Sequence, residues 1–234
     1  MFMIKFKIAF FIGISVIVQA CVQEVETGIN QPCPTSCIQI RGQFTTEDGT
    51  VGISGLPVKL RWGVYGMFNG KSRTIASSST DDNGYYDFSF TPQEEELEKG
   101  TFTVNFDPSS EYYAEENYFE LFNLNQKDTT VIRNYHIPLK ARLKIVITNP
   151  EQFTATDYLH CSVSYQFDAP EHKAFKVSGA LDTRYNNQNE FTFDAAGNQY
   201  TYVDILKKKD GLLESIKDSV LVAPAQELVY ELHF

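Results

Sequence analysis

Apolar and polar side chains alternate with a period of two along most of the chain that follows residue 37. Val58, Leu60 and Trp62, for example, alternate with Lys59 and Arg61. Successive side chains of a β-strand point to opposite faces of a sheet, so this alternation predicts strands with one face in a core. Further examples are 86–90 and 102–106. Turn signals separate these segments at Asp48-Gly49, Asn69-Gly70 and Asn83-Gly84, and we expect the last to form a tight hairpin.

A second set of alternating segments begins near Pro138. Its members are 141–147, 159–167, 175–177, 191–193, 200–206 and 228–234, whereas 107–135 is irregular and predicts long loops with a strand or two. No segment of useful length has the 3.6-residue apolar spacing of an amphipathic helix, and an α/β sheet needs crossover helices. We therefore predict an all-β chain of two tandem antiparallel β-sandwich domains, 38–138 and 139–234.

The first of these domains carries a recognisable series of motifs. They are Ile38-Gln-Ile-Arg-Gly42, Asp48-Gly49, Gly55-Leu-Pro-Val58, Thr80-Asp-Asp-Asn83-Gly84-Tyr85-Tyr86 and Gly100-Thr-Phe-Thr-Val104. The series resembles the carboxypeptidase regulatory-like domains, which are found in many lipoproteins and outer-membrane proteins of Bacteroidetes-type bacteria. The resemblance covers roughly residues 38–106 and implies a transthyretin-like (prealbumin-like) sandwich. Its motifs are structural, so it implies no activity, and the rest of the chain contains no recognisable peptidase.

The N-terminus has the three-part layout of a secretory signal peptide. Lys5 and Lys7 precede an apolar run over 8–18, and Val18-Gln19-Ala20-Cys21 closes the segment. This ending resembles the lipobox of bacterial lipoproteins, which implies cleavage after residue 20 and lipid attachment to Cys21. The alternative is an ordinary secretory signal followed by a coincidental cysteine. We expect a signal peptide over 1–20, a polar tether over 21–37 and a lipid-anchored protein of the cell envelope, on either face of the outer membrane.

Composition narrows the range of partners. The chain has 234 residues, of which 42% are hydrophobic, enough for a packed core. Its formal net charge of −10 argues against nucleic acid, whose phosphates need a basic surface, and against adhesion to an anionic bilayer by charge alone. We therefore expect no nucleic-acid partner, and membrane contact through N-terminal acyl chains instead.

Three cysteines remain after Cys21. Cys33-Pro-Thr-Ser-Cys37 is a close pair, and the envelope outside the cytoplasm permits disulfides. We favour a structural disulfide between Cys33 and Cys37 over two free thiols. The spacing is not that of a redox motif, and there is no second pair to complete a zinc site. Cys161 shares the strand face of Leu159 and Val163, so we expect it in the core as an inert thiol.

Catalytic motifs are absent from the sequence. None of the four histidines, at positions 136, 160, 172 and 233, begins an H-E-x-x-H run, and there is no G-x-S-x-G elbow. Asp81, Asp82 and Asn83 could offer oxygens to calcium, but a turn explains them without an ion. The run 93–99 predicts one helical turn whose charges form a solvated face. We expect no enzyme, no metal and no cofactor.

Two aromatic clusters remain as candidates for surface recognition. Trp62 and Tyr65 lie beside a glycine-rich turn, and Tyr112, Tyr113 and Tyr118 lie in the irregular segment. Exposed rings on sandwich loops can stack on sugars or anchor a protein. Against this, Trp62 continues the inward series from Val58, and the tyrosine-rich loop could cover a sandwich end. The sequence thus favours a protein-interaction or structural accessory module; the alternatives are a glycan-binding accessory and a fimbrillin-like pilus subunit.

Overall fold

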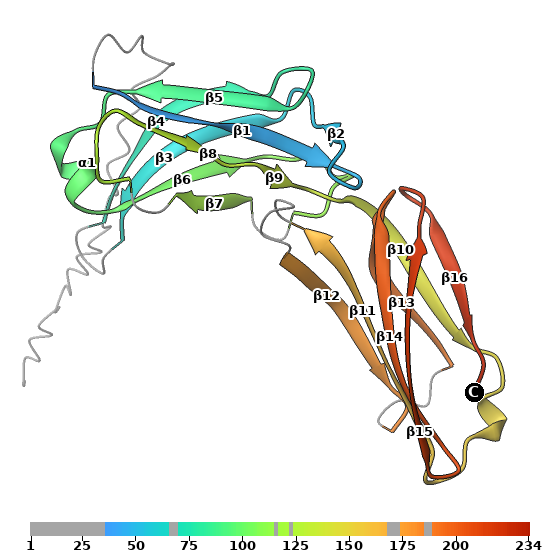
Figure 1. Cartoon of the computed structure of the whole chain (residues 1–234). Coiled ribbons are helices and arrows are strands. Elements are labelled where there is room, and N and C mark those ends of the chain that lie inside the picture. The colour runs from blue at the N-terminus through green and yellow to red at the C-terminus, as the bar shows by residue number, and fades with distance from the viewer. Residues whose placement is uncertain (1–35, 66–69, 115–116, 122–123, 168–173, 185–188) are drawn as a thin grey trace, which may run out of the picture.

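The structure is a computed structural model, and it describes residues 36–65, 70–114, 117–121, 124–167, 174–184 and 189–234. Within these residues the chain is all-β, with sixteen strands, one short α-helix and one 3₁₀ turn. The strands form two β-sandwiches that follow one another along the chain and together describe an arch (Figure 1). The all-β sandwich fold predicted from the alternation of side chains is confirmed. The expected signal peptide and most of the tether lie outside the described residues.

The first sandwich packs one sheet of five strands against one of four. The five-stranded sheet contains β1 (Ile38–Thr46), β2 (Val51–Gly52), β5 (Tyr85–Phe90), β8 (Thr129–Ile132) and β9 (Tyr135–His136). The four-stranded sheet has the order β4 (Lys71–Ser79), β3 (Pro57–Val64), β6 (Thr101–Phe106) and β7 (Tyr118–Leu121). Most pairs are antiparallel, but β8 and β9 run parallel to β1, which the sequence did not predict.

The second sandwich packs three strands against four. One sheet has the order β13 (Glu190–Gly197), β10 (Leu139–Ile147) and β16 (Glu227–Leu232), in which β10 and β16 are parallel. The other has the order β12 (Ala174–Asp182), β11 (Tyr158–Phe167), β14 (Tyr200–Lys209) and β15 (Leu212–Leu221). A 3₁₀ turn, η1 (Pro150–Gln152), follows β10. The β14–β15 connection is a two-residue turn with positive φ at Asp210 and Gly211, as expected for this dipeptide.

Each sandwich has a separate hydrophobic core, built from the alternate side chains of its strands that point inward. The first core gathers buried residues between Ile38 and Ile137, with Phe44 in contact with the rings of Tyr86 and Phe106. The second gathers buried residues between Ala141 and Phe234 and includes Cys161, as its parity predicted. Large β-branched and aromatic side chains on one face of each sheet therefore account for the stacking of the layers.

Two local predictions need correction. The turn at Asn83-Gly84 is not a tight hairpin between paired strands, because it leads from β4 in one sheet to β5 in the other. Only Gly84 has a positive φ, and a Cβ there would lie 2.3 Å from the carbonyl oxygen of Phe44. The run 93–99 does form the predicted helical turn, α1 (Glu94–Glu98), but its charges are not all solvated. Glu96 is only 2% exposed and pairs with Arg73.

Candidate recognition sites

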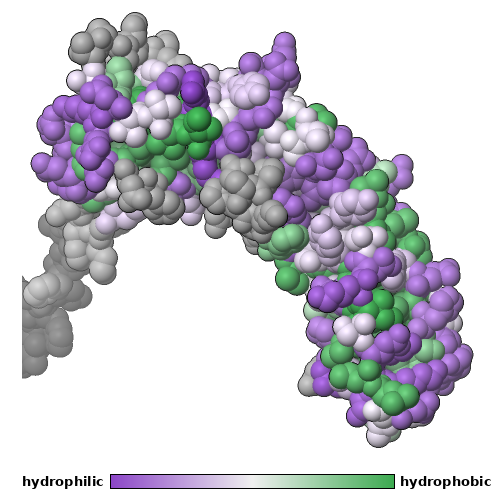
Figure 2. Space-filling model, viewed as in Figure 1, coloured by the Kyte–Doolittle hydropathy of each residue, from purple (hydrophilic) through white to green (hydrophobic). Residues whose placement is uncertain are grey.

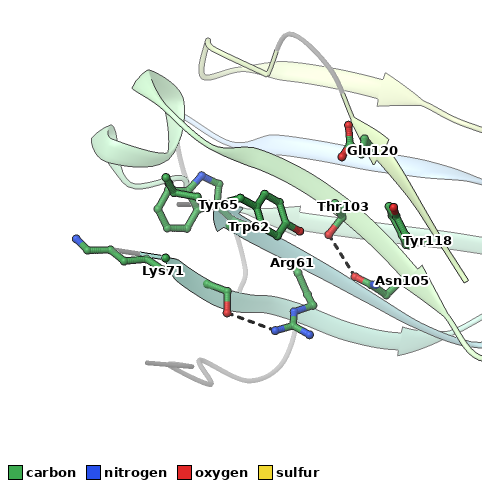
Figure 3. A pocket seen from close by; sticks show the side chains of 12 residues that line it. Arg61, Trp62, Tyr65, Lys71, Thr103, Asn105, Tyr118 and Glu120 are labelled. Carbon is green, nitrogen blue, oxygen red and sulfur yellow. Dashed lines mark hydrogen bonds between the residues drawn. The ribbon is translucent and has the colours of Figure 1, made fainter. Parts of the chain in front are cut away.

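A polar groove crosses the outer face of the sheet β4-β3-β6-β7 (Figure 3). Its volume is about 680 Å³, and it lies on the side of the sheet that faces away from the first core. The lining residues come from β3, β4, β6, β7 and the residues next to β3 and β4, and they are Arg61, Trp62, Gly63, Val64, Tyr65, Gly70, Lys71, Ser72, Thr103, Asn105, Tyr118 and Glu120. Tyr65 and Lys71 lie at one end, and Tyr118 and Asn105 lie toward the other (Figure 3).

Strand register explains the hollow shape of this groove. Arg61, Thr103 and Glu120 lie directly opposite one another on β3, β6 and β7. Adjacent strands are about 4.8 Å apart, so Arg61 and Glu120 are separated by about 10 Å, with the short side chain of Thr103 between them. Gly63 adds no side chain to the floor, and a Cβ placed there would be 3.9 Å from Cζ of Tyr65. Short residues thus form the floor, and long ones form the rim.

Hydrogen-bonding groups of both kinds line the groove. Thr103 donates its hydroxyl to Oδ1 of Asn105 at 3.2 Å, which leaves the amide donors of Asn105 available. Arg61 donates to the Ser72 hydroxyl at 3.4 Å. The side chain of Glu120 is exposed and adds carboxylate oxygens. The groove can therefore both donate to and accept from a ligand along its length.

The predicted aromatic residues at this end of the molecule are divided between surface and core. Tyr65 is 81% exposed and Tyr118 is 38% exposed, and both line the groove although 53 positions separate them. Trp62 is only 5% exposed, and its indole nitrogen donates to the carbonyl of Lys99 at 3.0 Å. Trp62 is therefore mainly a core residue, as its inward-facing position suggested, although it also lines the groove, and its role in recognition stays a prediction.

Tyr112 and Tyr113 lie in the junction between the sandwiches. Tyr112 packs on the first core and bridges to Leu139 of β10. The Tyr113 hydroxyl donates to Asp194 at 2.8 Å and to the carbonyl of Ala141 at 3.1 Å, and its ring stacks on Tyr165. Burial, followed by the Asp194 hydrogen bond, raises the pKa of Tyr113 well above its usual value. These contacts give both tyrosines a structural role at the junction, in line with a loop that covers a sandwich end, and their role in recognition stays a prediction.

The cysteines are only partly described. Cys37 is disulfide-bonded, whereas Cys33 lies outside the described residues, so their pairing stays a prediction. Cys21 also lies outside them, and its lipidation likewise stays a prediction. Cys161 is a free, fully buried thiol, and burial raises its pKa to about 12. A thiol with that pKa is almost entirely protonated at neutral pH and is a poor nucleophile.

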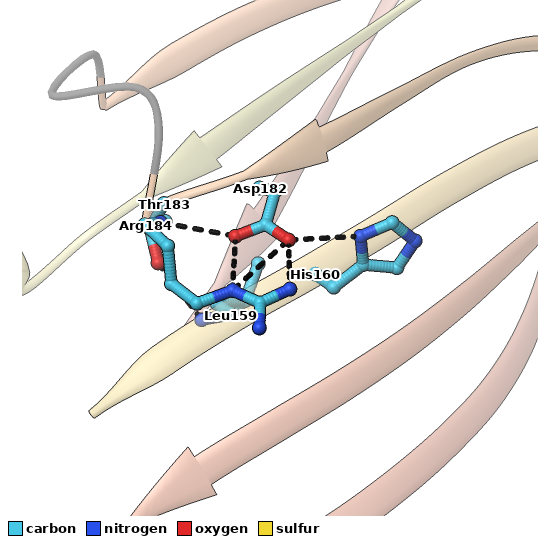
Figure 4. Close-up of polar contacts among 5 residues, drawn as sticks. All are labelled: Leu159, His160, Asp182, Thr183 and Arg184. Carbon is cyan, nitrogen blue, oxygen red and sulfur yellow. Dashed lines mark hydrogen bonds and ion pairs between the residues drawn. The ribbon is translucent and has the colours of Figure 1, made fainter. Parts of the chain in front are cut away.

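A charged cluster at the end of β12 is the nearest approach to an acid–base arrangement (Figure 4). Arg184 donates from Nε and from a terminal nitrogen to the two oxygens of Asp182, at 2.9 and 2.5 Å, and Nδ1 of His160 lies 3.5 Å from the same carboxylate. Hydrogen bonds from Arg184 hold the pKa of Asp182 down at about 2. Beside this cluster, the amide of Thr183 donates to the carbonyl of Leu159 and the amide of Leu159 donates to the Thr183 hydroxyl, which joins the residues after β12 to β11.

The chemistry of this cluster is structural. The contacts of Asp182 tie the last residues of β12 to β11, and the hydroxyl of Thr183 is engaged by the amide of Leu159 at 2.8 Å. Within the described part of the chain, no group of three or more His, Cys, Asp or Glu is placed to hold a metal ion. The described residues also contain no helix long and apolar enough to cross a membrane.

An apolar surface on the second sandwich was not anticipated. Phe175 and Val177 of β12 are 51% and 64% exposed and face outward, where the edge of the Phe175 ring contacts Tyr202 of β14. Tyr200 and Leu221 extend the surface. Figure 2 shows hydrophobic side chains reaching the exterior of this sandwich among hydrophilic ones. The sequence identified the alternation of 175–177 correctly, but alternation alone does not tell which face is inward.

Comparisons with known proteins give structural likeness only. No family model matches the chain, and no curated protein sequence matches it. Solved structures that resemble it include the TIE protein of Bacillus anthracis, at 12% identity and a TM-score of 0.35, covering 85% of this chain and 34% of that one. The shaft pilin SpaA of Lactobacillus rhamnosus GG is similar at 10% identity and a TM-score of 0.32, covering 85% of this chain and 96% of that one.

The minor pilin GBS52 of Streptococcus agalactiae is similar at 7% identity and a TM-score of 0.31, covering 85% of this chain and 95% of that one. This chain therefore spans about a third of the length of the TIE protein but nearly the whole length of the two pilins. Similarity at this level concerns the all-β architecture and carries no conclusion about function.

Proposed function

We propose that this protein is a non-catalytic lipoprotein of the cell envelope that serves as a protein-interaction or structural accessory. In this proposal Cys21 carries acyl chains, the first sandwich is a carboxypeptidase regulatory-like module, and the two sandwiches form one stiff arm. The observation that carries the proposal is the junction between the sandwiches, because a fixed junction makes an elongated two-domain chain a spacer rather than a pair of independently moving domains.

The junction is short and closed on several sides. Only Ile137 and Pro138 separate β9 from β10, and Ile137 is itself buried and donates its amide to Thr45. Buried His136 and Gln199 face each other at 2.6 Å between Nε2 and Oε1. The Gln199 side-chain amide donates to the carbonyl of Gln166 at 2.7 Å, so this side chain links the turn between β13 and β14 to β9 and to β11.

Tyr113 adds further hydrogen bonds at the junction. Its hydrogen bonds to Asp194 and Ala141 join the loop after β6 to β13 and β10. The backbone adds two further links, from Lys140 to the carbonyl of Glu111 at 2.7 Å and from Tyr113 to the carbonyl of Pro138 at 2.8 Å. Several hydrogen bonds thus join the sandwiches around a two-residue connection, which supports the role of a rigid arm.

Partner capture tests the interaction role. The full chain is purified from membranes in mild detergent, and co-purifying proteins are quantified by mass spectrometry. Phe175→Ser with Val177→Ser removes exposed apolar surface without touching either core, and Tyr85→Ser, on the first sandwich, is the matched control because Tyr85 is also 54% exposed. We expect a stoichiometric partner that the double variant loses and the control keeps. Equal recovery from all three forms, or no stoichiometric partner, would reject the interaction role.

Lipid attachment is tested separately. Cells that express the wild-type chain or Cys21→Ala are labelled with palmitate, and the label in the purified protein is counted. We expect the variant to lose the label, since the sulfur of Cys21 is the proposed attachment atom. Retention of the label by the variant would remove the lipoprotein part of the proposal while leaving the accessory role to the partner experiment.

Glycan binding is the second candidate function, and the groove with Tyr65 and Tyr118 is the specific observation that favours it. It places exposed rings beside hydrogen-bonding side chains, as a saccharide site needs. The described residues show no comparable site in favour of the fimbrillin-like alternative.

A further inference from the structure

We propose that the groove on the sheet β4-β3-β6-β7 binds an uncharged oligosaccharide, which lies across the strands with one sugar ring against Tyr65. This inference rests on the second candidate function above and specifies its site and ligand class. Three features of the groove carry it: the exposed ring beside a glycine, the near balance of its charges, and two central strands that are paired on both sides.

The first feature is the platform at Tyr65. Its ring is 81% exposed and lies beside Gly63, a buried glycine at which an added Cβ would be 3.9 Å from Cζ of Tyr65. A sugar presents a flat face of C–H groups, and an exposed phenol ring offers a matching apolar surface with few bonds to immobilise. Tyr118 supplies a second ring toward the far end of the groove. The four strands span about 14 Å, which suits an oligosaccharide rather than a single sugar.

The second feature is charge. Arg61 and Lys71 bring positive charge to the groove, while Glu120 lies across from Arg61 and Glu95 binds the Lys71 ammonium at 3.1 Å. Lys99 also binds Glu95, at 3.0 Å, so this connected set of three basic and two acidic side chains carries a net charge of only +1 and offers a polyanion little attraction. Saccharide hydroxyls both donate and accept, and the alternation of guanidinium, hydroxyl, amide and carboxylate groups along the groove matches that dual capacity.

The third feature disfavours a peptide ligand. An extended peptide gains most of its affinity by pairing with the exposed edge of a sheet. The central strands beneath the groove, β3 and β6, are each paired on both sides, so their backbone groups are already satisfied. Polar side chains also line the groove beside Trp62 and Val64, among them Ser72, Thr103 and Asn105. A ligand in the groove is therefore held mainly by hydrogen bonds between its polar groups and the side chains of the rim.

Calorimetric titration tests this inference. The full chain in detergent micelles is titrated with cellohexaose, xylohexaose, mannohexaose, oligogalacturonate and an unstructured peptide mixture from digested casein. The variants are Tyr65→Ala, which removes the platform, and Gly63→Leu, which fills the floor. A Cβ at Gly63 has no contact closer than 3.5 Å, so the substitution begins without a backbone clash. Tyr85→Ala, on the other sheet of the same sandwich, is the matched control.

We expect at least one neutral hexasaccharide to bind, and both groove variants to weaken it about tenfold or more while the control binds like wild type. Circular dichroism of each variant verifies the fold. Absence of neutral saccharide binding, binding of oligogalacturonate or peptide alone, or equal binding by Gly63→Leu would overturn the inference. None of these outcomes bears on the partner experiment with Phe175 and Val177, so the accessory role stands or falls separately.

Discussion

The ion pair between Arg73 and Glu96 offers the sharpest test of how the first sandwich is held together. The guanidinium donates from Nε and from a terminal nitrogen to the two carboxylate oxygens, each at 2.7 Å, and the second of these oxygens also accepts the amide of Gln93 at 2.8 Å. The Glu96 side chain is 1% exposed and that of Arg73 is 14%. The contact thus joins α1 to β4 inside the protein.

Glu96→Leu should destabilise the first sandwich strongly. The change removes the carboxylate that faces a largely buried guanidinium, and breaking such pairs costs about 3–5 kcal/mol. Because Arg73 retains some contact with solvent, we expect about 3 kcal/mol. Replacing both residues, with Arg73→Met and Glu96→Leu together, removes the charge as well as its partner and should restore most of that loss. Glu96→Gln keeps the acceptor for Gln93 and should fall between wild type and Glu96→Leu.

Urea unfolding followed by tryptophan fluorescence measures these changes. Trp62 is the sole tryptophan, and it is buried in this sandwich directly across from Arg73 on the neighbouring strand. With a slope of about 1.5 kcal/mol per molar urea, a loss of 3 kcal/mol lowers the midpoint by about 2 M. A loss below about 1 kcal/mol for Glu96→Leu, or a double variant no more stable than the single one, would show that the pair is not buried in the way the structure has it.

Three other predictions concern different parts of the molecule. Arg184 lowers the pKa of Asp182 to about 2, so Asp182 stabilises the fold above its ordinary pKa near 3.8 and loses that effect as the pH falls toward 2. Asp182→Asn should therefore lower the free energy of unfolding by about 1 kcal/mol at neutral pH and weaken its decrease between about pH 4 and 2. Urea titration followed by circular dichroism across that pH range measures both effects. The Cys161 thiol, with its pKa raised to about 12 by burial, should react with a thiol reagent at pH 8 only after urea is added, and fast labelling of the native protein would contradict its placement in the core. Gly84→Ala should cost more than 1 kcal/mol in thermal or urea unfolding, because a Cβ at φ +82° would meet the Phe44 carbonyl, whereas Gly55→Ala, also at positive φ but in open space, should cost less.

The sequence predicted the strands well because a sheet imposes a period that can be read locally. The parity of Val58, Leu60 and Trp62 placed all three in the core, and the structure has them buried. The same rule failed where local parity does not determine the inward face. Phe175 and Val177 alternate as a core strand does, yet they face solvent, because the inward face of β12 is set by its pairing with β11 and not by its own sequence.

The groove could be predicted only in part. Tyr65 and Tyr118 were both identified as candidate rings, but nothing local shows that they meet in one groove. They meet because β3, β6 and β7 lie side by side, and strand order is a property of the whole chain. The contacts of Tyr113 could not be predicted for the same reason, because its partners Asp194 and Tyr165 lie far along the chain, in the other sandwich. Sequence therefore identified the right residue types, and the fold decided which of them stay on the surface.

The proposed lipid anchor at Cys21 determines which sandwich lies nearer the membrane. The chain enters the first sandwich at Ile38, and β1 runs from there toward the junction, where Thr45 pairs with His136 (Figure 1). The fourteen residues 22–35 can span at most about 50 Å, so lipid attachment would keep the first sandwich near the membrane and hold the second one beyond it. Since the junction resists bending, the groove and the apolar surface at Phe175 would stand at fixed, different distances from the lipid. Two ligands of different chemistry could then be held at a fixed spacing, which a flexible linker between the sandwiches would not ensure.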